Sequence, residues 1–180
     1  MPPAPKVPTN FVEVLEQVWW RLDKCLDNDM TEASALIAAM GCAKRGVTFI
    51  IDHHAAPFAI KDSLETIARA FERVGVGHLL CSEISDRDGM KIAEDGLAEH
   101  DAYLSSGRHG LVGLHASFTI SDETLKKSVD LAVKHKTGLH IHVAEAQSDQ
   151  DDCLGKYKMR VAERLDKFGV LAQPHTILGH

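Results

Sequence analysis

Residues 138–145, Gly-Leu-His-Ile-His-Val-Ala-Glu, are the stretch of sequence that decides the fold. Apolar residues alternate with two histidines, which predicts a buried strand with His140 and His142 on one face. A carboxylate, Glu145, follows three residues after the second imidazole. We therefore expect either an ordinary polar strand end or a metal ligand beside a proton-transfer group.

Four more apolar runs occur in the chain, and segments with helical periodicity separate them. The apolar runs are Val47–Ile51, Val76–Cys81, Gly110–Leu114 and Thr176–His180. The segments with helical periodicity predict helices over 10–26, 31–44, 62–74, 88–106, from 121 onward and over 148–168. A chain that alternates strand and helix forms a parallel sheet with helices outside it. Strands that are apolar along their whole length need cover on both faces. The sequence therefore predicts an α/β fold with about five parallel strands.

Polar side chains follow these runs where each strand ends, and they decide how the sheet closes. They are Asp52-His53-His54, Ser82-Glu83, His115, His142 with Glu145, and His180. No strand is followed by the Gly-x-Gly-x-x-Gly turn of an open dinucleotide-binding sheet. Catalytic groups from several strand ends are typical of a (β/α)8 barrel, which takes about 250 residues. The 180 residues therefore predict a partial (β/α)8 TIM-like barrel over 10–180 with outer helices, after an extended proline-rich segment over 1–9.

The composition limits the classes of partner that the protein can bind and indicates its cellular compartment. The net charge is −6 and no basic block occurs, which argues against nucleic acid as a partner. No apolar run reaches the length of a membrane span, and the first residues carry no apolar signal-peptide core, so we expect no membrane partner. The four cysteines are far apart and form no Cys-x-x-Cys pair, which predicts reduced, mostly buried thiols in a cytoplasmic protein.

His142, Glu145 and His180 are the residues that we expect to carry chemistry. A catalytic zinc ion commonly has three protein ligands and leaves one position for water, whose pKa falls toward about 7. His142 would bind such an ion, and His180, at the end of the next strand, could reach the same metal or orient its water. Glu145 could move protons between that water, the substrate and the leaving group. Because imidazole suits several divalent metals, iron and manganese remain alternatives to zinc.

For the other polar residues near the strand ends, the sequence predicts more ordinary roles. His115 is placed to contact a small-molecule substrate, although a capping or solvated role fits it nearly as well. His140 lies one layer below His142 and is expected to pack. We expect Glu83 at a polar rim and Cys81 as a buried thiol. The remaining histidines are expected to be solvated: His78, His100, His109, His135 and His175.

Two rival interpretations remain open at this point. A strand that ends in Asp52-His53-His54 is also typical of manganese phosphoesterases, but that class needs a separate Asp-x-Asp strand end upstream, and none precedes residue 47. Convergence of this Asp-His-His group on a metal without His142 would favour that class. The chain could also be a non-catalytic fragment or truncated paralogue that acts only as a folded partner.

Three stretches resemble a known family more specifically than the His-x-x-Glu pattern does. They are Asn-Phe-Val-Glu-Val-Leu-Glu over 10–16 with Trp-Trp-Arg-Leu-Asp-Lys over 19–24, Ile-Asp-His-His-Ala over 51–55, and Gly-Leu-His-Ala-Ser-Phe-Thr over 113–119. Together with His-Val-Ala-Glu over 142–145 and the strand that ends at His180, they resemble the aminohydrolase and chlorohydrolase branch of the amidohydrolase superfamily. Within that branch the similarity is greatest to the SsnA-type aminohydrolases associated with selenium metabolism. The resemblance covers residues 10–180.

This resemblance implies a metal-dependent barrel enzyme that hydrolytically deaminates or dechlorinates an amidine-like or heterocyclic carbon of a small molecule. By resemblance, His142 is the metal ligand on the fifth strand, and Glu145 is the acid/base that protonates a ring nitrogen and the leaving amine. His180 helps to hold or to activate the hydroxide, and His115 contacts the substrate.

Two features of that family have no counterpart in this sequence. The family's first strand carries a His-x-His metal pair, which does not occur before residue 47, and the chain stops before the aspartate of the last strand. Two imidazole ligands cannot complete a three-ligand site, so we expect the isolated chain to be inactive and to bind metal weakly. Unpaired sheet edges favour association, so we also expect a homo-oligomer.

Overall fold

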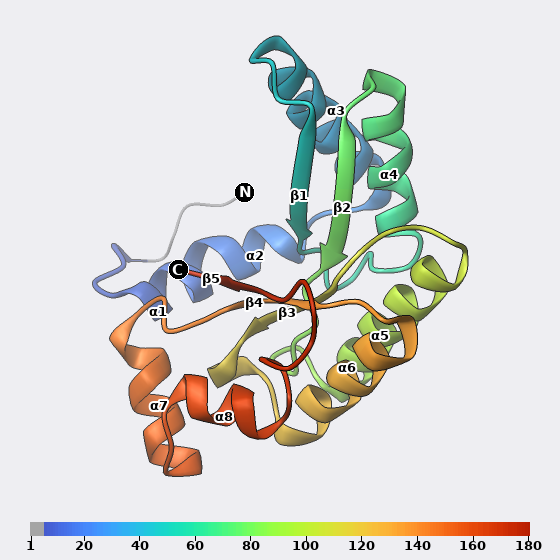
Figure 1. Cartoon of the computed structure of the whole chain (residues 1–180). Helices are drawn as coiled ribbons and strands as arrows, with labels where there is room; N and C mark the ends of the chain where they lie inside the picture. Colours follow the sequence, from blue (N-terminus) through green and yellow to red (C-terminus); the bar gives the residue numbers. More distant parts are fainter. Residues whose placement is uncertain (1–5) are drawn as a thin grey trace.

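Five parallel strands form the centre of the computed structural model, which describes residues 6–180 (Figure 1). They are β1 (Phe49–His54), β2 (Gly77–Ser82), β3 (Val112–Ala116), β4 (Leu139–His142) and β5 (Ile177–Gly179). β1 pairs with β2, and β3, β4 and β5 pair in that order, every pair being parallel. The bridges Leu80–Gly110 and Ile84–Leu114 join β2 to β3. The predicted α/β fold with a partial barrel is therefore confirmed.

Helices follow the strands along the chain and lie beside them (Figure 1). They are α3 (Asn28–Lys44), α4 (Ser63–Val74), α5 (Met90–Ser105), α6 (Asp122–His135), α7 (Gln147–Tyr157) and α8 (Val161–Lys167), with a single 3-10 turn at Ser117–Thr119 after β3. Within residues 6–180, no helix combines the length and the apolarity that crossing a bilayer requires.

Two clusters of buried side chains fill the space between strands and helices. One packs β3 and β4 against α6 and α8 and includes Leu114 and Ile141, which are completely buried. The other packs β2 against α3 and α4 and includes Leu80 and Phe71. Burying a side chain of this size contributes about 1.5–3 kcal/mol. The two clusters therefore hold the strands, and with them the strand ends, in fixed positions.

His100 joins the two parts of the sheet from its place in α5. Its Nε2 accepts hydrogen bonds from the backbone N–H groups of Ser82 and Gly113, both at 3.1 Å, and its Nδ1 donates to the carbonyl of Gly96 at 2.7 Å. The two amides belong to β2 and β3, which pair only through isolated bridges there. The expectation that His100 is solvated is therefore wrong: the side chain is fully buried because it satisfies backbone groups that the diverging strands leave unpaired.

Replacing His100 with glutamine is expected to reduce the loss of stability in acid. Burial lowers the pKa of His100 from 6.5 to about 4, although the bond to Gly96 opposes that shift. A group whose folded pKa is lowered in this way contributes stability that is present above pH 6.5 and is lost as the pH falls toward 4. Glutamine does not titrate, so the difference in unfolding free energy between wild type and H100Q should shrink by up to about 1.4 kcal/mol per pH unit. Urea titrations between about pH 4 and pH 7 measure this; an unchanged difference would contradict it.

The outer edge of the sheet departs from the prediction that β1 is a buried strand. Phe49 is 55% exposed and Ile51 is 45% exposed, although both belong to the apolar run that predicts burial. β1 pairs with β2 on one side only. The face that carries Phe49 and Ile51 has no complete covering layer among residues 6–180, which explains the exposure.

The helix expected over 148–168 is two helices, α7 and α8. Lys158 adopts a left-handed conformation with φ of 58°, which ends α7 and turns the chain before α8. Leu154 is exposed, and its neighbour Cys153 is the residue of α7 that is completely buried. The turn is what allows α8 to approach the end of β3, as described below.

The first helix contains one π-helical turn, which shifts the side chains that follow it. It consists of α1 (Phe11–Val14), the π segment Leu15–Trp19 and α2 (Trp20–Asp23). Regular helical spacing would place Trp19 on the apolar side of this helix, where it would be buried. In the structure Trp19 is 51% exposed, and it is Trp20 that faces the strand ends. The π turn adds one residue to the helical repeat and so rotates the later side chains. Of the predicted extended segment 1–9, residues 1–5 lie outside the described part; Thr9 donates its backbone N–H to Glu13.

Candidate active site

His142, Glu145 and His180 meet at the carboxyl end of β4 and β5. The backbone N–H of Val143 donates to the carbonyl of Gly179 at 3.0 Å, which continues the pairing of the two strands to this point. His142 Nδ1 lies 3.2 Å from His180 Nε2, and His180 Nε2 lies 3.5 Å from Glu145 Oε2. One ligand atom from each residue lies within 4.8 Å of the others. The structure thus brings together the three residues that the sequence singled out.

The spacing of these donor atoms fits a single metal ion. Two nitrogen ligands at 2.0–2.1 Å from a tetrahedral zinc ion are about 3.3 Å apart, close to the observed separation of the two imidazoles. A side chain at Gly179 would place its Cβ 3.3 Å from His142 Nδ1, so glycine keeps room beside that nitrogen. Burial lowers the pKa of His142, and His180 lowers it further while Glu145 opposes the shift. A neutral imidazole keeps the lone pair that a metal needs.

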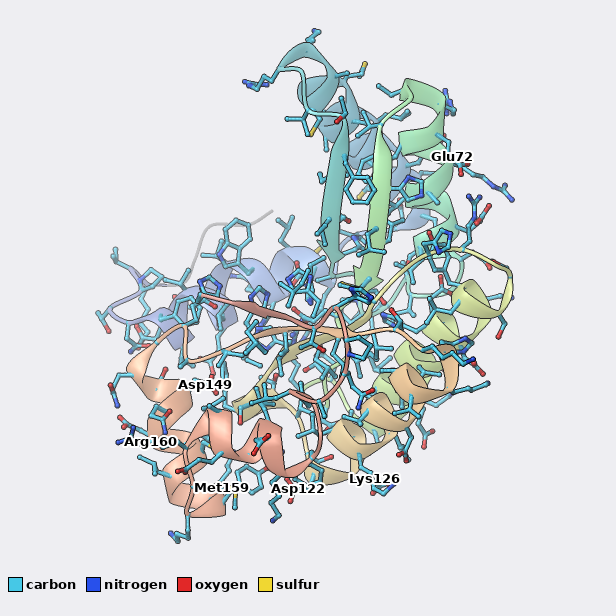
Figure 2. All side chains as sticks on the ribbon, in the orientation of Figure 1. Glu72, Asp122, Lys126, Asp149, Met159 and Arg160 are labelled. Atoms are coloured by element: carbon cyan, nitrogen blue, oxygen red, sulfur yellow. The ribbon has the colours of Figure 1, made fainter. Side chains whose placement is uncertain are left out.

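Asp149 fixes the turn that carries Glu145 toward the two histidines. Its Oδ2 accepts the backbone N–H of Ala144 at 2.9 Å, and its Oδ1 accepts that of Phe118 at 3.2 Å. Ala144 is held at φ of 52°, a left-handed conformation that reverses the chain before Glu145. Asp149 lies at the start of α7 and is buried (Figure 2). Asp149 was not predicted as a site residue, because its acidic position in a first helical turn is the only sign of it in the sequence.

Arg164 holds the loop that follows β3 from a buried position in α8. Its guanidinium donates to both the carbonyl and the hydroxyl of Ser117 at 2.8 Å and to the carbonyl of Ile120 at 2.7 Å. It also pairs with Asp122 at 2.9 Å and lies over the ring of Tyr157 at 3.9 Å. Arg164 therefore fixes the loop after His115 together with Asp149, and the sequence did not indicate its role.

His115, the expected substrate contact, is buried beside His142. Its Nδ1 lies 2.7 Å from Thr119 Oγ1, and this hydroxyl donates its own hydrogen to the carbonyl of Ala116 at 3.1 Å. The hydroxyl therefore accepts from Nδ1–H, which leaves the Nε2 lone pair of His115 as an acceptor. Burial lowers the pKa of His115 to about 2, with Arg87 lowering it further, so the ring is neutral. Its centroid lies 6.0 Å from that of His142.

Glu83, Arg87 and Trp20 form a wall next to His115 that the sequence analysis did not assign to the site. The ring of Trp20 contacts that of His115 edge-on at 5.9 Å, and the guanidinium of Arg87 lies 5.0 Å above the Trp20 ring. Arg87 also pairs with Glu83. Burial raises the pKa of Glu83 to about 7, although Arg87 opposes the shift. The expectation that Glu83 lies at a polar rim is wrong, because its side chain is only 9% exposed and is paired with Arg87.

The ring of His53 lies beside the rings of His140 and His142, on the face of β1 opposite to Asp52 and His54. Its ring centroid is 5.0 Å from that of His142 and 4.7 Å from that of His140. Asp52 and His54 alternate with it along β1 and so lie on the opposite face. Within residues 6–180, neither of them belongs to a group of side chains that could hold a metal. The convergence that a phosphoesterase of the Asp-His-His type requires is therefore not observed.

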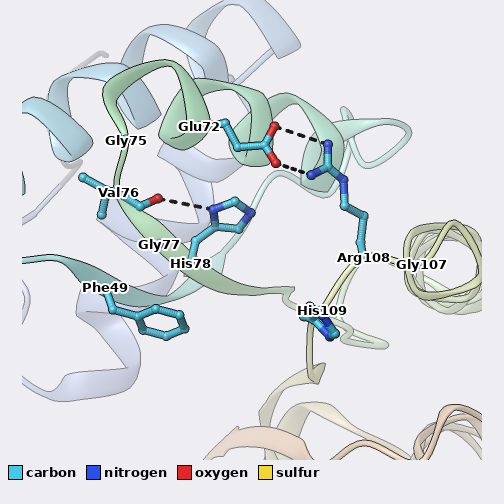
Figure 3. A pocket seen from close by; sticks show the side chains of 9 residues that line it. All are labelled: Phe49, Glu72, Gly75, Val76, Gly77, His78, Gly107, Arg108 and His109. Carbon is cyan, nitrogen blue, oxygen red and sulfur yellow. Dashed lines mark hydrogen bonds and ion pairs between the residues drawn. The ribbon is translucent and has the colours of Figure 1, made fainter.

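A cavity of about 570 Å³ lies at the opposite, amino-terminal ends of β1 and β2 (Figure 3). Its charged lining residues, Arg108 and Glu72, pair with each other, and Arg108 also pairs with Glu65 at 2.8 Å. Because the charge of this arginine is already balanced, the cavity supports no assignment as a substrate site.

Proteins of similar sequence are deaminases. The chain is 29% identical to a 5'-deoxyadenosine deaminase from Methanoregula boonei, over 92% of this chain and 37% of that protein. It is 23% identical to an 8-oxoguanine deaminase from Pseudomonas aeruginosa, over 94% of this chain and 41% of that protein. The chain thus spans about two fifths of the length of these relatives.

Solved structures share the fold. A guanine deaminase from C. acetobutylicum with bound guanine superimposes with a TM-score of 0.81 at 14% identity, over 94% of this chain and 43% of that one. An adenosine deaminase from Xanthomonas campestris with bound zinc superimposes with a TM-score of 0.78 at 17% identity, over 96% of this chain and 40% of that one.

A family model matches nearly the whole chain and confirms the resemblance to the amidohydrolase superfamily. The model of the amidohydrolase family matches residues 9–180, which include every strand and every candidate site residue described above. The chain therefore belongs to the amidohydrolase family.

Proposed function

We propose that residues 10–180 are the central part of a metal-dependent barrel enzyme that hydrolytically deaminates or dechlorinates an amidine-like or heterocyclic carbon of a small molecule. The observation that carries the proposal is the 3.2 Å separation of His142 Nδ1 and His180 Nε2 with the Glu145 carboxylate beside them. The relatives are named as deaminases of a purine base and a purine nucleoside, and these names support the same reaction class.

In this proposal His142 and His180 would hold one divalent metal ion, with zinc the first candidate. A zinc ion is present in the related adenosine deaminase, and two imidazoles with a carboxylate are donors that zinc accepts. Iron and manganese accept the same donors and remain alternatives. When bound, such an ion supplies a Lewis acid and brings the pKa of water toward about 7.

The remaining residues would position the substrate and move its protons. Glu145 would carry one proton from the attacking water to the ring nitrogen, and a second proton from the hydroxyl of the resulting adduct to the leaving amine. Its carboxylate is held in reach by the turn at Ala144, which Asp149 fixes. His115 offers a neutral Nε2 that accepts a hydrogen bond from a substrate N–H. The buried wall of Trp20 and Arg87 limits the space beside that contact.

The isolated 180-residue chain is expected to show no turnover. Its described residues provide two imidazoles and one carboxylate at the candidate metal centre, and in our proposal the carboxylate is needed for proton transfer. Ammonia or chloride release from purine and chlorotriazine substrates, measured with added zinc, should equal the background rate. Zinc-dependent turnover that is lost in Glu145→Gln would show instead that this chain is sufficient for catalysis.

A non-catalytic role as a folded partner is the second candidate, and metal binding separates the two. If the chain only folds and binds another protein, substitutions of His142 and His180 would leave its metal affinity unchanged.

The cysteines form no disulfide within the described residues, which supports our proposal of a reducing, cytoplasmic compartment.

We also propose that the chain forms homo-oligomers through the edge of β1. Phe49 and Ile51 are exposed on this strand, which has a free pairing edge among the described residues. Replacing Ile51 with lysine places a charge on the edge and is expected to shift the chain toward monomers. Light scattering over a concentration series measures the mass of both proteins. A monomeric wild type at every concentration would contradict the proposal.

A further inference from the structure

A second group of metal-binding side chains lies below the candidate active site. His53, Cys81 and His140 come from β1, β2 and β4, and one ligand atom from each lies within 4.8 Å of the others. Cys81 Sγ lies 3.7 Å from His140 Nδ1, and the rings of His53 and His140 are 4.7 Å apart. None of these three residues belongs to the group formed by His142, Glu145 and His180.

A glycine on β3 allows these side chains to meet across the strand between them. β3 separates β2 from β4, and Gly113 is the residue of β3 in register with His140. A side chain at Gly113 would place its Cβ 3.0 Å from Cys81 Cβ and even closer to the Ser82 backbone. The absence of a side chain there leaves open the path between the thiol and the imidazole.

The donor atoms match the spacing of ligands around a thiophilic cation. A sulfur at 2.3 Å and a nitrogen at 2.0–2.1 Å from a tetrahedral zinc ion are about 3.6 Å apart, close to the distance between Cys81 Sγ and His140 Nδ1. His53 Nε2 lies 3.2 Å from the carbonyl of Leu114, to which it can donate, leaving the lone pair on Nδ1. Metal-bound histidines commonly anchor their second nitrogen on a carbonyl in this way.

We propose that His53, Cys81 and His140 form a second binding site, for a thiophilic divalent cation of the zinc class, separate from the site at His142 and His180. Binding breaks the S–H bond of Cys81, forms a metal–sulfur bond and releases the thiol proton to solvent. Both histidines are partly exposed, whereas the sulfur of Cys81 is buried. The site does not depend on the proposed hydrolysis.

Cobalt(II) tests the proposal because its bond to a thiolate gives a charge-transfer band in the near ultraviolet. The purified wild-type chain, titrated with cobalt, is expected to show this band and to release one thiol proton for each metal ion bound there. Cys81→Ser should abolish the band. The triple variant C25S/C42S/C153S, which keeps only Cys81, should retain it, and so should His142→Ala.

The outcomes distinguish this site from the candidate active site. Loss of the band in His140→Ala with retention in His142→Ala supports two sites, whatever the catalytic result. A wild-type chain that binds cobalt without the band overturns the proposal, as does a band that survives Cys81→Ser. If Cys81→Ser fails to fold, loss of the band from the folded triple variant overturns the proposal on its own. Circular dichroism of each variant establishes which case applies.

Discussion

Replacing Arg164 with methionine is expected to lower the free energy of unfolding by about 3–5 kcal/mol, the range for breaking a buried ionic network by removing one partner. Arg164 is 1% exposed and makes five hydrogen bonds, to Ser117, Ile120 and Asp122. Methionine fills much of the same volume but donates none of them. The carbonyl of Ile120 would remain buried without a donor, and that of Ser117 would keep only the N–H of Ile120 at 3.5 Å. Each lost buried hydrogen bond costs about 1–3 kcal/mol. Urea unfolding of the two proteins measures the difference.

A matched substitution at the surface separates this effect from the general cost of losing an arginine. Arg45 is exposed at the end of α3, and its guanidinium donates to the carbonyl of Gly41 at 3.2 Å. Arg45→Met is expected to change the unfolding free energy by less than about 0.5 kcal/mol. Equal effects at the two positions would mean that the network around Arg164 does not hold the loop after β3.

His142→Ala and His180→Ala are each expected to weaken zinc binding at the candidate active site by about 100-fold. Zinc bound to four protein ligands gains about 10–16 kcal/mol, so one ligand contributes about 3 kcal/mol, or about 100-fold in affinity. The 3.2 Å separation of their nitrogens makes both residues ligands of the same ion in our proposal. Competition with a chromophoric chelator measures the affinity, and the Cys81→Ser background removes the contribution of the second site.

His109→Ala is the control for these two substitutions. His109 is exposed and lies at the opposite ends of the strands, beside the cavity of Figure 3. Its removal should leave zinc affinity unchanged within error. An unaltered affinity in His142→Ala, or a loss in His109→Ala as large as that in His142→Ala, would refute the assignment of the metal centre.

Most of the fold was predictable because strand and helix alternate and each strand is an apolar run. The apolar run Val47–Ile51 predicts β1 correctly as an element but not its exposure, since exposure depends on which layers surround the strand. The break between α7 and α8 was not predictable, because Lys158 carries no residue-type signal for a left-handed conformation. The π turn before Trp20 was missed for the same reason: it depends on packing rather than on periodicity.

The site residues at the ends of consecutive strands were predictable from the sequence. The side chains that bind backbone groups of distant elements were not. His142, Glu145 and His180 stand at the ends of consecutive strands, and parallel pairing brings such ends together. The partners of His100 and Arg164 are mainly backbone amides and carbonyls from other elements, which no sequence pattern marks. The position of His53 beside His142 brings β1 close to β4 although β2 and β3 lie between them in the strand order, and no sequence pattern shows such an approach.

Anomalous diffraction at the zinc absorption edge, from crystals of the zinc-loaded chain, tests the central claim most directly. We predict a zinc peak at about 2.0–2.1 Å from both His142 Nδ1 and His180 Nε2, with the carboxylate of Glu145 beside it. A map in which the two rings face apart, or in which zinc binds without either of them, would contradict the proposed metal centre.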